Sequence, residues 1–223
     1  MKFVKATLVA ALALTVSGCA SVDVATRNAS FEAPKEQSPL SEVIAIRDVE
    51  VNVSRDLRVS EAELFYPVAD IVWRGEARGD RYEQVGAIFQ DSAKVATKDL
   101  RGATPAHVEI DVLRFHSVTD KARYTVGGSH SISFMMRVTD PATGIDLMAP
   151  RKVKADLKAF GGQAAIEADA RGETQKKRVT EHLVGVIRGE LETAAAATGT
   201  VTRNAGEEVA QAANSETPVP ALY

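Results

Sequence analysis

The sequence has one cysteine, few aromatic residues and no excess of positive charge. A single cysteine cannot form an intramolecular disulfide, so a folded domain of this chain depends on its hydrophobic core alone. The formal net charge is −3, which argues against a nucleic-acid-binding protein, because such proteins need a basic face to displace counterions from phosphate groups. No apolar run is long enough to span a bilayer as a helix.

Common catalytic and metal-binding motifs are also missing. The sequence contains no Gly-x-Ser-x-Gly for a serine nucleophile and no His-Glu-x-x-His for zinc. His116 and His130 could face each other across a hairpin, but no third zinc ligand is evident. We therefore expect no cofactor, no metal ion and no enzymatic activity. An enzyme that uses His116, His130 or Asp70 is the less favoured alternative.

The first 19 residues have the parts of an export signal in the correct order. Lys2 and Lys5 precede an apolar run over residues 6–16, which leads into Ser-Gly and the only cysteine, Cys19. A basic start, a short apolar segment and small residues before a cleavage site are typical of a secretory signal peptide. The sequence Val16-Ser17-Gly18-Cys19 resembles the lipobox of bacterial lipoproteins, in which cleavage precedes a cysteine that becomes lipidated.

The lipobox resemblance implies a location. Residues 1–18 would be removed, and Cys19 would carry a diacylglyceryl thioether and usually an amide-linked acyl chain, which together hold a protein stably on a membrane. Because Ala20 and not aspartate follows the cysteine, the sorting rule of Gram-negative lipoproteins implies the outer membrane, facing the periplasm. Removal of Lys2 and Lys5 changes the net charge from −3 to −5.

The rest of the chain divides into a tether, one domain and a tail. Residues 19–40 are rich in polar residues and proline and lack apolar periodicity, which predicts a flexible tether. Residues 41–193 carry regular apolar patterns and are expected to form a periplasmic domain. Residues 194–223 are rich in alanine and polar residues, and we expect them to be a disordered tail.

Apolar periodicity within the domain predicts its fold. Residues alternate with a period of two, as in strands, over 49–53, 108–113, 132–138 and 153–159. A spacing of three and four predicts two amphipathic helices, one after an N-cap at Asp80 and one after Thr174. Successive alternating strands favour antiparallel pairing. We therefore expect an α+β fold, a two-layer sandwich whose mainly antiparallel sheet has two amphipathic helices packed on one face.

The densest group of unusual residues lies between Pro67 and Arg81. It could be a packed connection in which aspartates and arginines satisfy each other and Asp80 caps a helix. It could also be a loop that binds a partner, with Trp73 as an apolar anchor. The candidate partner-binding residues, extended by the two histidines above, are Asp70, Trp73, Arg74, Asp80, Arg81, His116 and His130.

Several segments resemble known lipoproteins. Residues 67–85, Arg114-Phe115-His116, residues 127–130 and residues 178–183 are similar to uncharacterised lipoproteins of Rhodobacter-type alphaproteobacteria, which imply no activity. The expected element order is also similar to the amino-terminal domain of TolB, to curli-secretion lipoproteins and to auxiliary lipoproteins of lipid transporters. These resemblances imply a non-enzymatic, lipid-anchored envelope protein that binds a protein or envelope partner. An auxiliary lipoprotein of a lipid or solute transporter, which would need an apolar groove, is the alternative.

Overall fold

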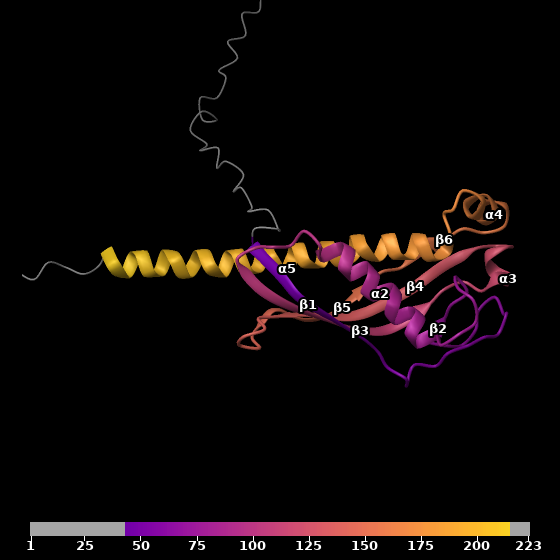
Figure 1. The fold of residues 1–223 in the computed structure, drawn as a ribbon, viewed down its shortest axis with the longest axis horizontal. Helices are drawn as coiled ribbons and strands as arrows, with labels where there is room; N and C mark the ends of the chain where they lie inside the picture. Colours follow the sequence, from indigo (N-terminus) through magenta and orange to yellow (C-terminus); the bar gives the residue numbers. More distant parts are fainter. Residues whose placement is uncertain (1–42, 215–223) are drawn as a thin grey trace, which may run out of the picture. The chain divides into compact units, whose positions relative to one another are not determined.

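A computed structural model describes residues 43–214, so the predicted signal peptide, Cys19, the tether up to residue 40 and residues 215–223 lie outside the described residues. The fold is α+β, as predicted (Figure 1). Its elements are, in order, β1 (Ile44–Val53), β2 (Ile71–Val72), α2 (Arg81–Thr97), β3 (Thr104–His116), α3 (Asp120–Arg123), β4 (Gly128–Thr139), β5 (Asp146–Lys154), β6 (Leu157–Ala159), α4 (Gln163–Ala170) and α5 (Gln175–Asn214).

The strands form one mixed sheet in the order β1-β3-β4-β5. β3 pairs with β4 and β4 with β5 in antiparallel fashion, as predicted. β1 pairs with β3 in parallel, because α2 carries the chain back between them, and the sequence patterns did not predict this pairing. The short strand β2 pairs with Phe115 and His116 near the end of β3, and β6 pairs with the start of β4.

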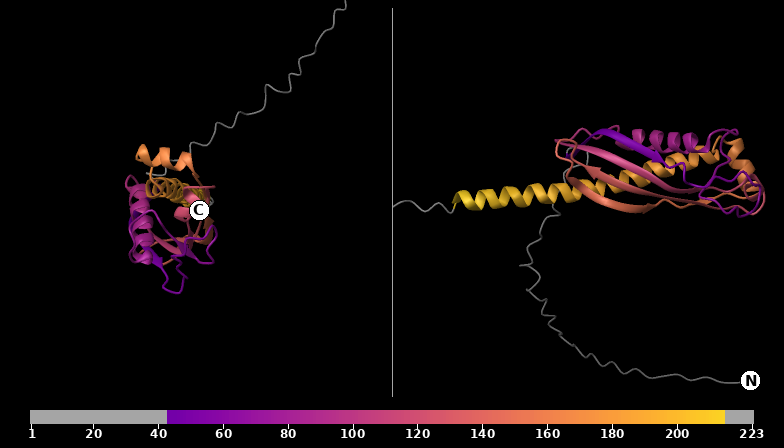
Figure 2. Two further views of the ribbon diagram at one scale, coloured as in Figure 1. Left: turned by 90° about the vertical axis from the view of Figure 1, so that its right-hand side faces the viewer. Right: turned by 90° about the horizontal axis from the view of Figure 1, so that it is seen from below.

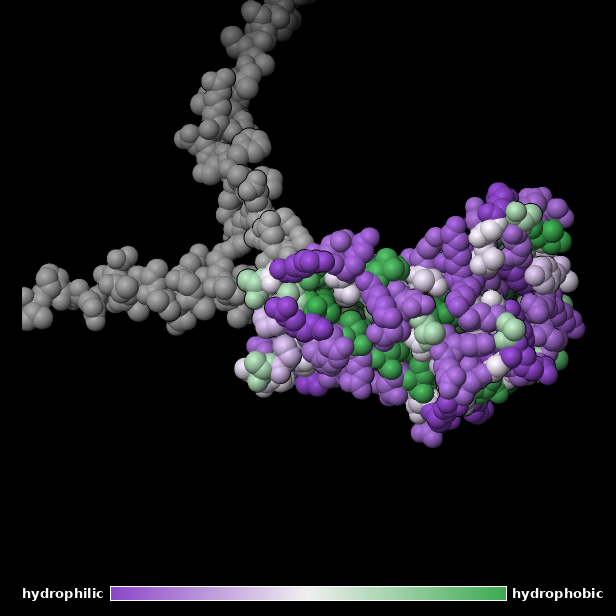
Figure 3. Space-filling model, in the orientation of Figure 1, coloured by the Kyte–Doolittle hydropathy of each residue, from purple (hydrophilic) through white to green (hydrophobic). Residues whose placement is uncertain are grey.

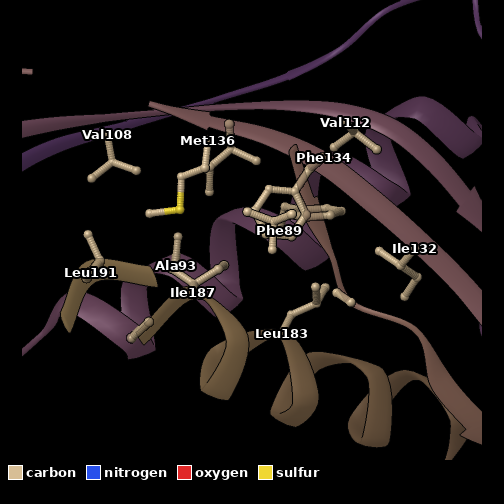
Figure 4. Close-up of a cluster of buried hydrophobic side chains, with 14 of the residues drawn as sticks. Phe89, Ala93, Val108, Val112, Ile132, Phe134, Met136, Leu183, Ile187 and Leu191 are labelled. Atoms are coloured by element: carbon tan, nitrogen blue, oxygen red, sulfur yellow. The ribbon is translucent and has the colours of Figure 1, made fainter. Parts of the chain in front are cut away.

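Both long helices pack on the same face of the sheet, and the core lies between them and the strands (Figures 1, 2 and 4). The N-cap at Asp80 is present, since its carboxylate accepts hydrogen bonds from the backbone N–H groups of Tyr82 and Glu83. The inward side chains of α2 and α5 recur every three or four residues, and Figure 4 shows them meeting those of β3 and β4: Phe89 and Ala93, Leu183, Ile187 and Leu191, Val108 and Val112, and Ile132, Phe134 and Met136.

β1 forms an edge of the sheet and is only partly covered. Its residues Val49, Val51 and Val53 are half-buried and pack against the core. In the space-filling view, apolar side chains reach the surface in a narrow strip beside β1 and α2, with hydrophilic side chains around it (Figure 3).

The structure also differs from the sequence predictions at three further places. The polar connection between β3 and β4 contains a helical turn, α3, capped by the hydroxyl of Thr119. The strand expected over residues 153–159 is divided in two, and at the break the Asp156 carboxylate accepts a hydrogen bond from the backbone N–H of Ile132 at 2.9 Å. α5 continues to Asn214, so residues 194–214 are helical where the sequence predicted a disordered tail.

The two ends of the sheet carry different parts of the chain. At the tether end, β1 and β3 begin, α2 ends, and residues 140–145 turn from β4 into β5. We call the opposite end the loop end; it holds residues 54–80 and residues 117–127, together with the first turns of α2 and α5. α5 runs from the loop end towards the tether end and continues past the sheet (Figures 1 and 2).

A close backbone contact at the loop end offers a test of the packing. A Cβ atom on Gly161 would lie 2.3 Å from the backbone nitrogen of Gly127, whereas a Cβ on Gly185 of α5 would meet no atom within 4 Å. We expect Gly161→Ala to lower the free energy of unfolding by about 1–3 kcal/mol. The control Gly185→Ala should leave it unchanged or raise it by up to about 1 kcal/mol. Urea unfolding of both variants measures the difference, and equal effects would contradict the contact.

Candidate functional site

Two buried arginines hold the segment of residues 60–68 at the loop end. The side chains of Arg74 and Arg81 are only 7% and 4% exposed. Arg81 Nε donates to Glu61 Oε1 at 2.8 Å, and Arg74 Nε donates to Glu63 Oε1 at 2.5 Å. The hydrogen bond from Arg81 keeps the pKa of Glu61 below its ordinary value. Each buried cation therefore has a carboxylate partner, which is the condition for burying it.

His116 holds the next part of the same segment. Its Nε2 atom lies 2.9 Å from the carbonyl oxygen of Pro67, and its ring stacks on that of Tyr66 with 6.0 Å between the ring centroids. The hydroxyl of Thr119 donates to the carbonyl oxygen of Leu64 at 2.9 Å. The two loops at this end are thus joined by hydrogen bonds that fix their backbone conformation.

Several large apolar side chains on these two joined loops are exposed to solvent. We call these six residues the apolar loop patch: Leu64, Phe65, Tyr66, Val68, Tyr124 and Val126. Val68 is 84% exposed and Tyr66 is 79% exposed. Exposed apolar residues that cluster and are surrounded by polar groups are typical of interaction sites. Sequence reasoning missed this patch, although the apolar run around Pro67, between segments of regular periodicity, is a visible signal.

The remaining candidates from the strand-to-helix connection also have internal partners. Trp73 is fully buried, its indole N–H donates to Glu76 at 2.9 Å, and its ring meets that of Phe115 edge to face. The Asp70 carboxylate accepts from the backbone N–H of Arg58 at 2.9 Å. Asp80 caps α2. The structure thus gives Asp70, Trp73 and Asp80 supporting contacts; their contact with a partner stays a prediction.

His130 belongs to a separate chain of buried hydrogen bonds. Arg123 pairs with Asp169 at 2.7 Å and also donates to Gln175 Oε1 at 3.3 Å. Gln175 Nε2 donates to the Ser117 hydroxyl at 2.7 Å, and that oxygen lies 2.8 Å from His130 Nδ1. The Ser117 oxygen accepts from Gln175 and keeps both its own proton and a second lone pair, so its role toward Nδ1 follows the tautomer of His130.

The His130 ring is neutral because its surroundings disfavour a charge. It is fully buried, and Arg178, Arg123 and His182 act on it electrostatically. Burial, followed by these neighbouring charges, lowers the pKa of His130 to about 3. Its Nε2 atom, Arg178 Nη1 and His182 Nε2 are buried without a hydrogen-bond partner among the described residues.

The candidate residues do not form one reactive centre. His116 and His130 take different partners, Pro67 and Ser117, and do not face each other as the sequence suggested. Within residues 43–214, no group of three or more histidine, cysteine or acidic side chains has the arrangement of a metal site. The arrangement can therefore position two loops and present the apolar loop patch on a fixed backbone.

The buried neutral His130 predicts a specific pH dependence. In the unfolded chain this group binds a proton near its ordinary pKa of 6.5, whereas the folded protein keeps it neutral down to about pH 3. Its contribution to stability is thus present above pH 6.5 and is lost as the pH falls towards 3. Between pH 7 and pH 5, this group should cost about 2 kcal/mol of unfolding free energy.

Denaturant unfolding at several pH values measures this loss. His130→Gln should flatten the pH dependence of the unfolding free energy between pH 7 and pH 5. An NMR titration of the wild-type protein in which the His130 ring gains its proton near pH 6 would contradict the assignment.

Comparisons with known proteins add a family and a few distant likenesses. A crystallised candidate lipoprotein from Caulobacter crescentus CB15 is 14% identical, with a TM-score of 0.34 over 54% of this chain and 86% of its own. Protein XCC0632 from Xanthomonas campestris, of family DUF330, is 16% identical, with a TM-score of 0.39 over 68% of this chain and 90% of its own. No curated protein matches the chain.

Among residues 43–214, none of the helices has both the length and the apolar character needed to cross a membrane.

A family model matches residues 44–207, which includes every strand of the sheet and most of α5. The chain belongs to DUF6778, a family of unknown function.

Proposed function

We propose that this chain is a non-enzymatic, lipid-anchored protein of the cell envelope whose loop end binds a protein partner. The observation that carries the proposal is the apolar loop patch, six exposed apolar side chains on two loops that buried ion pairs and hydrogen bonds hold in place. A fixed apolar surface binds with a smaller loss of conformational entropy than a mobile one. Aromatic residues, of which the patch has three, are enriched in protein interfaces.

The lipobox supports the anchor, and the topology places the apolar loop patch and the predicted attachment of the tether at opposite ends of the sheet. The predicted tether joins the domain at the tether end, where β1 begins. The apolar loop patch lies at the opposite end of the sheet, beyond the last residue of β3. Attachment through Cys19 would therefore leave the patch free of the tether, where a second envelope protein can reach it. By the sorting rule, we propose the periplasmic face of the outer membrane.

The transporter-auxiliary alternative predicts an apolar groove that could hold a lipid chain. Two of the hollows in the described part of the chain have several charged side chains in their lining, and neither is an apolar groove. One of them contains Arg55, Glu61, Arg78, Asp80 and Arg81. We therefore favour a protein partner over a carried lipid.

Crosslinking in intact cells tests the proposed interface. A photo-crosslinking residue at Tyr66 should give a discrete protein adduct, because Tyr66 lies within the apolar loop patch. The matched control is Ile145, a 65% exposed apolar residue at the tether end, which should not give that adduct. Val68→Ser should weaken the Tyr66 adduct at least fivefold, as expected for a residue within an interface.

Stability measurements separate loss of binding from loss of folding. Because Val68 is almost fully exposed, Val68→Ser should change the free energy of unfolding by no more than about 0.5 kcal/mol. The proposal would be contradicted if Tyr66 and Ile145 gave the same adducts, or if the Tyr66 adduct persisted unchanged in the Val68→Ser protein.

A further inference from the structure

A hollow of about 440 Å³ lies at the tether end, between the start of β1 and the end of α2. Its lining residues are Ala45, Ile46, Arg47, Thr97, Lys98, Leu100 and Arg101. Two backbone hydrogen bonds fix its shape: the N–H of Gly102 donates to the carbonyl of Ile44, and that of Leu100 donates to the carbonyl of Thr97, both at 2.9 Å. The hollow is thus part of the folded domain.

Three basic side chains line this hollow, and no acidic side chain among residues 43–214 forms an ion pair with them. Arg47, Lys98 and Arg101 are exposed, and none of them forms an ion pair with another described residue. Asp99 is adjacent in sequence and exposed, but it does not line the hollow. Unpaired cations around a concave surface raise the local positive potential and attract an anion.

The hollow lies next to the point where the predicted tether joins the domain. Residues 19–42 separate Cys19 from the start of the described chain. A flexible segment of this length has an r.m.s. end-to-end distance of about 25–30 Å. If Cys19 is lipidated, the hollow therefore stays within reach of the head groups of the same membrane.

We propose that this hollow binds the phosphate-bearing head group of an anionic phospholipid in the membrane that holds the anchor. Arginine and lysine are the side chains that bind phosphate oxygens best, because both donate charge-assisted hydrogen bonds. The proposal rests on the proposed anchor for its location, but it does not depend on the apolar loop patch. It gives the domain a second membrane contact, which would restrict its orientation on the tether.

The course of α5 limits how the domain can approach a bilayer. This helix leaves the sheet at the tether end as well (Figure 2). The hollow can therefore meet a bilayer when α5 lies along the surface, and not when the helix points into it. In this orientation the β1 and α2 side of the tether end faces the head groups, and the loop end stays accessible.

Vesicle binding tests this proposal with the mature chain, residues 19–223, carrying Cys19→Ser, so that neither the signal peptide nor an acyl anchor contributes. The measured quantity is the ratio of binding to phosphatidylglycerol-containing vesicles over pure phosphatidylcholine vesicles. Each basic residue near an anionic surface contributes about fivefold to binding. The triple variant Arg47→Gln, Lys98→Gln, Arg101→Gln should therefore lower the ratio by up to about a hundredfold.

The control replaces three exposed lysines elsewhere, Lys152, Lys154 and Lys158, by glutamine and removes the same net charge. This control should largely keep the preference for anionic vesicles. An equal loss in both variants, or no loss in the first, would overturn the proposal. Calorimetry with inorganic phosphate separates a lipid site from a site for a soluble anion. If phosphate binds the wild-type chain and not the triple variant, but the triple variant keeps the wild-type preference for anionic vesicles, the site serves a soluble anion and the proposal is overturned.

Discussion

The packing of α2 and α5 against β3 and β4 is the interaction on which the rest of the structure depends. The chain has one cysteine, so the core has no disulfide to support it. Phe89 shows how the layers meet, since its ring contacts Phe134 edge to face at 5.3 Å between centroids and also lies near Phe115. Because both helices use this one face, their first turns come together at the loop end, where Arg81 and Gln175 then reach their partners.

Burying the arginines at the loop end costs free energy, and their ion pairs and hydrogen bonds offset that cost. Buried arginines lose their hydration, and only well-placed carboxylates and carbonyls compensate for it. Glu61 and Glu63 supply those groups to Arg81 and Arg74, and they bring residues 60–68 against the body of the protein. The consequence is a set of exposed apolar side chains on a fixed backbone. The buried ion pairs thus hold the apolar loop patch in place, and such departures from simple packing rules are expected at functional sites.

Local patterns predicted much of the fold, and tertiary contacts account for what they missed. The Asp80 cap and the apolar spacing were enough for α2, and the alternation of apolar residues was enough for the antiparallel pairing of β4 with β5. The parallel pairing of β1 with β3 depends on a crossover and has no local signature. The candidate site was predicted less well: Arg74 and Trp73 stood out by residue type, but only the fold shows that they are buried and that Tyr66 and Val68 are exposed.

These observations describe a domain with two different ends, one at which the described chain begins and one that carries the apolar loop patch. The proposed membrane location depends on lipidation of Cys19. Intact-mass analysis of the protein extracted from native membranes tests this most directly. The account predicts a chain that begins at Cys19 and carries the added mass of a diacylglyceryl group, with or without a further acyl chain. An unmodified chain that begins at Met1 and has a free thiol would contradict it.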